Sequence, residues 1–302
     1  MSDLVPAIAE ASATGAVAEI FADIRTVLGV EVVNLIWRHL ATIPDALPWA
    51  WGMLRPLYAD GTIRAEAQAL HTRIALPHLP PFPHDLLAAV GLGGDDLASI
   101  RHILAAYDRT NAMALIALSA LLCRLDGVPA ESGQAALGTP EQSAAPPSAI
   151  SLPPLPGLDA LSEPIASLVL TLNRLGTRRD NPVLARMYRH LAYWPSYLAV
   201  SWALIAPLDA GGSLERAIAD ALTKARTQAA RLAMRLRPPP LDPAAEEAGV
   251  NEPVRLGKIA RRNPWLEVDP VLTVARVESS PIIVARSRPR TTLGRILLSA
   301  AA

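Results

Sequence analysis

An internal repeat constrains the fold of this chain more than any other feature of its sequence. Residues 38–75 return as 189–226, at an offset of 151, with identity at 12 of the 38 aligned positions. The identities include an Arg-His-Leu-Ala run with a proline three residues after it, and Trp51 with Trp202. Apolar residues for helix packing, prolines and a turn glycine all recur at this one spacing, which chance does not explain. The sequence therefore predicts two copies of one folding unit.

The repeat predicts how the chain is divided. Residues 1–137 are expected to form the first unit and residues 158–302 the second, joined by a linker over 138–157 that contains six prolines. The second unit carries about four extra residues near 177–180. Its last part, about 240–302, lacks the helical stripe of the first unit and is expected to be divergent or poorly ordered.

Helical patterns dominate both units. Alanine, leucine and arginine are frequent, whereas alternating β-branched runs with hairpin turns are almost absent. Apolar residues at three- and four-residue spacing predict a helix over 15–28, closed by Gly29. Further helices are expected at 31–42, 45–57, 62–75, 84–90, 94–106 and 110–124. The predicted fold class is all-α, built from two tandem helical repeats.

Charge and cysteine content exclude several classes of function. The 28 basic residues equal the 28 acidic ones, so no electrostatic argument favours nucleic acid or a membrane surface as partner. The single cysteine, Cys123, excludes an internal disulfide and is expected to be a buried, inert thiol. The first residues lack a basic signal-peptide segment, and the apolar run 112–123 is too short to span a bilayer. A cytoplasmic protein is expected.

The common motifs for phosphate, dinucleotide and acyl-transfer chemistry do not occur in the sequence. His71, His78 and His84 lack the spacing and the carboxylates of a zinc site, so no metal is expected. His39 and His190 occupy equivalent positions of the repeat, and a structural role in packing is expected for both rather than metal binding.

Asn111 is the polar residue that most invites a functional interpretation. It follows Tyr-Asp-Arg-Thr at 107–110 and precedes the apolar stretch that begins at Ala112. A side chain there either caps a helix or faces a cavity, and residue type alone favours the cap.

Three segments carry a resemblance to a known family. Residues 19–30 and 38–51 resemble the first repeat of the group I 2-haloacid dehalogenases, the all-helical and non-stereospecific family. The Leu-Ala-Tyr-Trp-Pro run at 191–195 resembles the second repeat. The likeness covers about 15–125 and 160–225. It implies an all-α pseudo-dimer related to the carboxymuconolactone decarboxylase-like helical fold, with a cofactor-independent site between the repeats. It also allows a homodimer.

The resemblance implies that an activated water hydrolyses the carbon–halogen bond of a small 2-halocarboxylic acid, with inversion. In the family, an asparagine places the water and an aspartate accepts its proton. The asparagine position matches Asn111, the aspartate position falls on Met187, and a neighbouring serine becomes Arg186. The remaining pocket positions fall on Val32, Leu35, Ala114 and Tyr188. Either Arg186 or Arg38 is expected to neutralise the substrate carboxylate.

Two functions stay open at this point. A thioether cannot take a proton from water at neutral pH, so Met187 does not allow the family's mechanism to run unchanged. The first hypothesis is a hydrolase that acts on carbon–halide bonds of small 2-halocarboxylic acids. The alternative is a non-catalytic helical scaffold that binds a small carboxylate or self-associates.

Overall fold

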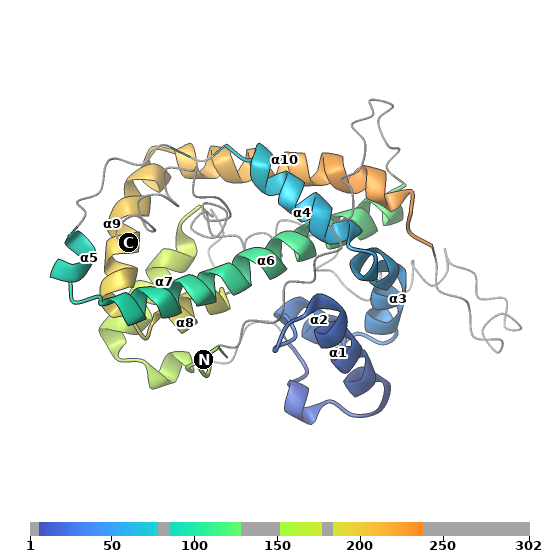
Figure 1. Ribbon diagram of the computed structural model, residues 1–302, viewed down its shortest axis with the longest axis horizontal. Coiled ribbons are helices and arrows are strands. Elements are labelled where there is room, and N and C mark those ends of the chain that lie inside the picture. The colour runs from blue at the N-terminus through green and yellow to red at the C-terminus, as the bar shows by residue number, and fades with distance from the viewer. Residues whose placement is uncertain (1–5, 76, 78–84, 128–151, 177–183, 238–302) are drawn as a thin grey trace, which may run out of the picture.

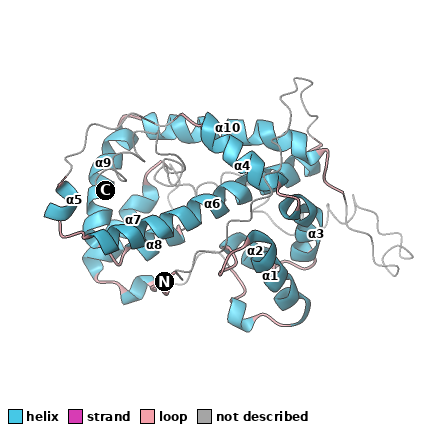
Figure 2. Cartoon of the chain, in the orientation of Figure 1, coloured by secondary structure: helices cyan, strands magenta, loops and turns pink. Residues whose placement is uncertain are grey.

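The computed structural model describes residues 6–75, 77, 85–127, 152–176 and 184–237. Within these residues every regular element is a helix and no strand occurs (Figure 2), so the all-α fold class is confirmed. The elements are η1 (Glu10–Ser12), α1 (Gly15–Leu28), α2 (Leu35–Leu40), α3 (Ala46–Ala59), α4 (Thr62–Arg73), α5 (Leu86–Ala89), α6 (Gly94–Leu125), η2 (Leu158–Ala160), α7 (Glu163–Arg174), α8 (Arg186–Leu191), α9 (Pro195–Ala210) and α10 (Ser213–Ala233).

Several sequence predictions concern residues outside the ranges that the structure describes. Most of the Pro-rich linker, the extra residues near 177–180, His78, His84 and the C-terminal part from 238 onward lie outside the described residues. The prediction for about 240–302 therefore stays a prediction.

Helix α1 has the bounds that the sequence predicts. Its apolar stripe buries Phe21, Ile24 and Leu28, and the helix ends at Gly29 in the left-handed region, with φ 63°. A side chain would be strained there, which is why glycine closes the helix. The corresponding helix of the second half, α7, is followed by Gly176 with φ 73°. The two ends differ in detail, because the residue directly after α7, Leu175, is extended and the left-handed glycine follows it.

Helix α6 corrects the predicted break at 107–109. It is one continuous helix of 32 residues, because the polar residues there include neither glycine nor proline and keep helical geometry. Asn111 consequently lies inside the helix, and the preference for a capping role was wrong. In Figure 1, α6 runs through the middle of the molecule, with α7, α8 and α9 near its first end and α3 near its second.

The two halves of the chain exchange helices between two hydrophobic cores. The first core combines α1 to α4 with the second half of α6 and the second half of α10. The second core combines α7, α8 and α9 with α5, the first half of α6 and Leu214 at the start of α10. Each sequence half therefore contributes a long helix to the core of the other, and neither core is complete within one half.

The helix bounds keep the offset of the sequence repeat. Helices α2 and α8 begin and end 151 residues apart, α3 and α9 end 151 apart, and α4 and α10 begin 151 apart. The surroundings differ, because Trp51 is 4% exposed whereas Trp202 is 42% exposed. The tandem-repeat interpretation agrees with these bounds and stays a prediction. No helix within the described ranges has both the length and the hydropathy needed to cross a bilayer.

Candidate functional site

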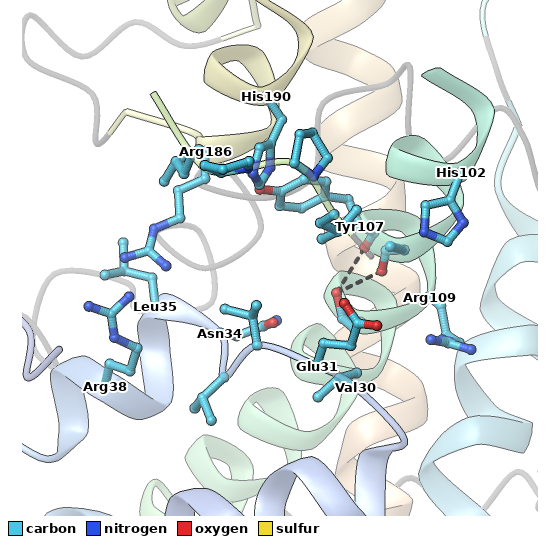
Figure 3. Close-up of a pocket in the computed structure, with 18 of the residues that line it drawn as sticks. Val30, Glu31, Asn34, Leu35, Arg38, His102, Tyr107, Arg109, Arg186 and His190 are labelled. Carbon is cyan, nitrogen blue, oxygen red and sulfur yellow. Dashed lines mark hydrogen bonds between the residues drawn. The ribbon is translucent and has the colours of Figure 1, made fainter. Parts of the chain in front are cut away.

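A cavity of about 530 Å³ lies where the two halves meet. Its walls come from the loop between α1 and α2, from α2, from the middle of α6, from residues 152–155 and from α8. Figure 3 shows side chains from these elements surrounding one space. The charged and polar residues of the lining are Glu31, Asn34, Arg38, His102, Tyr107, Arg109, Thr110, Arg186 and His190.

Two arginines from opposite walls face each other across one side of this cavity. Arg38 stands on α2 and Arg186 on α8, and Figure 3 shows their guanidinium groups pointing toward one another. The Nε of Arg186 is buried and has no hydrogen-bond partner among the described residues. Two like charges that converge on a cavity repel each other unless an anion lies between them, and a planar carboxylate matches the guanidinium donors.

The repeated Arg-His pair positions α2 and α8 in the same way in both halves. Arg38 donates from Nε to the carbonyl oxygen of Ile8 at 2.8 Å, and Arg189 donates from Nε to that of Pro156 at 2.8 Å. The histidine Nδ1 of His39 lies 2.7 Å from the carbonyl oxygen of Pro6. Each pair thus holds the extended segment that precedes the first helix of its half, which supports the predicted structural role.

His190 also takes part in the cavity wall. Its Nδ1 lies 2.7 Å from the hydroxyl oxygen of Tyr107, so the side chains of α8 and α6 meet directly. The pKa of His190 is lowered to about 4, mainly by burial; a hydrogen bond with Pro153 opposes this shift, and the positive charges of Arg189 and Arg186 add to it. The imidazole is therefore neutral at pH 7 and can accept a proton.

Thr110 and Arg109 complete the α6 side of the cavity. The Thr110 hydroxyl donates to carbonyl oxygens one turn earlier in the helix, at 2.9 Å to Ala106 and 3.3 Å to Tyr107. Burial lowers the pKa of Arg109, with a smaller contribution from the charge of Arg64. The polar residues at 107–110, where the sequence suggested a helix break, therefore contribute side chains to the cavity wall.

The predicted site residues divide into two groups. Val32, Leu35, Arg38 and Arg186 line the cavity. The other four are buried and are not part of that lining: Asn111, Ala114, Met187 and Tyr188. Met187 is 1% exposed and packs in the second core.

Acidic side chains are scarce around the cavity. Among the described residues Glu31 is the one carboxylate of the lining, and it is exposed. A second carboxylate, Asp108 on α6, lies 3.4 Å from Nε2 of His71 on α4, and both side chains are buried. Burial lowers the pKa of His71 to about 4, so this histidine is neutral at pH 7 and the contact is not an ion pair. No cluster of three metal-ligating side chains occurs in the described part of the chain.

Sequence reasoning missed Tyr107, Asn34 and Glu31. The signal for Tyr107 was present, because it begins the polar run inside an otherwise apolar helix. Asn34 and Glu31 lie in a loop whose direction depends on how α1 packs, and no local pattern marks them. Cys123 is buried as predicted, and burial raises the pKa of its thiol.

Comparison with known proteins identifies the fold. The sequence matches no family model, and no curated protein matches it. A D-2-haloacid dehalogenase mutant aligns with a TM-score of 0.62 at 18% identity, over 92% of this chain and 96% of that chain. The mutant in complex with D-2-CPA and the dehalogenase in complex with L-LA align with TM-scores of 0.55 and 0.56, at the same identity and coverage. The chain therefore shares the all-helical fold of the D-2-haloacid dehalogenases.

Proposed function

We propose that the cavity binds a small carboxylic acid and that the protein hydrolyses the carbon–halogen bond of 2-halocarboxylic acids there. The observation that carries this proposal is the buried Nε of Arg186, which has no hydrogen-bond partner in the described part of the chain and lines the cavity opposite Arg38. The fold shared with D-2-haloacid dehalogenases supports the reaction class.

The carboxylate of the substrate lies between the two guanidinium groups in this proposal. Charge-assisted hydrogen bonds from arginine to carboxylate are short and directional, so they would fix the orientation of the α-carbon. Val32 and Leu35 also line the cavity and offer apolar contact to a short alkyl group. A volume of about 530 Å³ admits such an acid together with water.

The reaction needs no group beyond water and a proton acceptor. The oxygen of water forms a bond to the α-carbon, the carbon–halogen bond breaks, and the halide leaves with its electron pair. One proton of the water must then be accepted by the protein and passed to solvent. The candidates for that task are Tyr107 on α6, His190 on the same helix as Arg186, and the exposed Glu31, all of which line the cavity.

One observation favours the alternative of a carboxylate-binding protein without turnover. Met187, at the position where the resembling family has its aspartate, is buried in the second core and does not line the cavity. The two functions share the arginine site and differ only in the chemical step. Binding and turnover must therefore be measured separately.

The test is chloride release from each enantiomer of 2-chloropropionate. Arg186→Met removes the charge and keeps the apolar stem, and Arg226→Met removes one charge from an exposed position on α10. We expect kcat/KM to fall at least about 10-fold in Arg186→Met, since a hydrogen bond to a charged group contributes about 1.5–3 kcal/mol. Arg226→Met should behave as wild type. Absence of chloride release from both enantiomers would overturn the hydrolase and leave the binding protein.

A further inference from the structure

A hydrogen bond between Tyr107 and His190 links the α6 and α8 walls of the cavity. Tyr107 stands in the middle of α6, and His190 stands on α8, 83 residues later in the chain. Their ring centroids are 5.7 Å apart, and both residues line the cavity that contains Arg186. A hydroxyl that touches the cavity and an imidazole behind it form a short path for a proton.

We propose that Tyr107 and His190 act as the proton-accepting pair of this cavity, in the place that a carboxylate would otherwise take. The inference rests on the proposed function, because the pair has a task only if water attacks a bound substrate. When the ring proton is on Nε2, Nδ1 accepts the hydrogen bond of the Tyr107 hydroxyl at 2.7 Å. This tautomer leaves the phenolic oxygen able to accept a hydrogen bond from water.

The step balances with the groups present. Water attacks the α-carbon and halide departs, while one proton of the water moves to the oxygen of Tyr107. The proton that Tyr107 held moves to Nδ1 of His190, which becomes an imidazolium. The imidazolium then returns its proton through Tyr107 to solvent, and both side chains regain their starting state. The products are the 2-hydroxy acid, halide and one proton.

The basicity of His190 suits this task. Its pKa of about 4 equals that of an ordinary aspartate, so the neutral imidazole is as strong a base as the carboxylate it would replace. Arg186 is one of the charges that lower this pKa, and a substrate carboxylate bound to Arg186 would offset that charge. Substrate binding would thereby strengthen the base.

The other charged and titratable groups around the pair do not offer the same path. They come from every element packed against the cavity: Glu31, Arg38, His102, Arg109 and Arg186 in the lining, and Arg189 beside His190 on α8. Four of the six are arginines, which stay protonated and cannot accept a proton. Figure 3 shows the imidazole of His102 apart from Tyr107 and His190. Glu31 is exposed at the rim.

The test compares three variants in chloride release from 2-chloropropionate and in calorimetric binding of propionate, which has no leaving group. Tyr107→Phe removes the hydroxyl and keeps the ring. His190→Gln keeps a polar side chain that does not titrate. Tyr193→Phe is the matched control, because its hydroxyl donates to the carbonyl oxygen of Pro154 at 2.8 Å and the residue does not line the cavity.

We expect Tyr107→Phe to lower kcat by about 10²–10⁴-fold, the usual contribution of general-base catalysis, with propionate affinity changed less than about 3-fold. Wild-type kcat/KM should fall as the pH approaches 4 from above, and His190→Gln should lose this dependence along with most of kcat. Tyr193→Phe should match wild type.

Each other outcome has a distinct meaning. Wild-type turnover that survives in both Tyr107→Phe and His190→Gln would overturn the proton-accepting pair and leave the hydrolase intact. Propionate binding without any chloride release would overturn the pair and the hydrolase but retain the carboxylate site. Failure of the wild type to bind propionate would overturn the proposed function itself, and the pair with it.

Discussion

Gln228 on α10 donates from Nε2 to a carboxylate oxygen of Glu66 on α4 at 2.7 Å, although 162 residues separate them in the chain. Both residues are 1% exposed, and the same amide also donates to the backbone oxygen of Glu66 at 3.1 Å. This contact joins the two sequence halves inside the first core. Besides apolar packing, this hydrogen bond therefore holds α10 of the second half against α4 of the first half.

Replacing Gln228 by leucine should therefore destabilise the whole protein. The variant removes a hydrogen bond to a buried carboxylate, a loss of about 1.5–3 kcal/mol in the free energy of unfolding. Urea unfolding at pH 7 measures the change. Thr227→Ala is the control, because the Thr227 hydroxyl bonds within its own helix at an exposed position and should change stability by less than about 0.5 kcal/mol. Equal stability of the two variants would show that the exchange contact is not significant.

His71 predicts how stability depends on pH. Its pKa is about 4 in the folded protein against an unperturbed 6.5, so between these values the unfolded chain binds more protons than the folded one. The contribution of the neutral His71 to stability is fully present above about pH 6.5 and is lost as the pH falls toward 4. From pH 7 to pH 5 this histidine alone should cost on the order of 2 kcal/mol of unfolding free energy.

His71→Gln should remove that part of the pH dependence, since glutamine does not titrate. His190 has a similarly lowered pKa, so the variant should keep a slope of the same sign and smaller size. Urea unfolding at several pH values between 5 and 7 measures it, with Thr72→Ala, an exposed neighbour, as control. An unchanged slope in His71→Gln would contradict the burial of a neutral imidazole at this position.

Met187→Asp should destabilise the protein rather than create a base. Met187 is 1% exposed in the second core, and a carboxylate introduced there would lose its hydration without gaining a charged partner. We expect a loss of about 3 kcal/mol or more, against less than about 1.5 kcal/mol for Met187→Leu. Urea unfolding gives both values, and chloride release should not increase. A stable Met187→Asp protein with higher activity would place this side chain at the reaction centre.

The sequence predicted the elements more successfully than their assembly. Periodicity and Gly29 were sufficient for α1, because both signals are local. The break predicted within 94–124 was wrong, since a polar turn without glycine or proline does not end a helix. The sharing of α6 and α10 between two cores depends on long-range packing, which no window of sequence contains.

The candidate site was predicted only in part, for a related physical reason. Val32, Leu35, Arg38 and Arg186 line the cavity, and their role in binding a substrate stays a prediction. Met187 is the direct neighbour of Arg186, yet on a helix consecutive side chains point about 100° apart, so one reaches the cavity and the other the core. The pairing of Tyr107 with His190 joins two helices from different halves. Tyr107 begins a polar run and His190 belongs to the repeated Arg-His pair, but no local pattern predicts that the two side chains meet.

The central claim is that Arg186 helps to hold the carboxylate of a small acid in the cavity. Isothermal calorimetry of propionate against propionamide, with wild type, Arg186→Met and Arg226→Met, tests it most directly. We predict that the wild type and Arg226→Met bind propionate at least about 10-fold more tightly than the amide, and that Arg186→Met loses this preference. Equal affinity of the wild type for acid and amide, or a preference that survives in Arg186→Met, would contradict the claim.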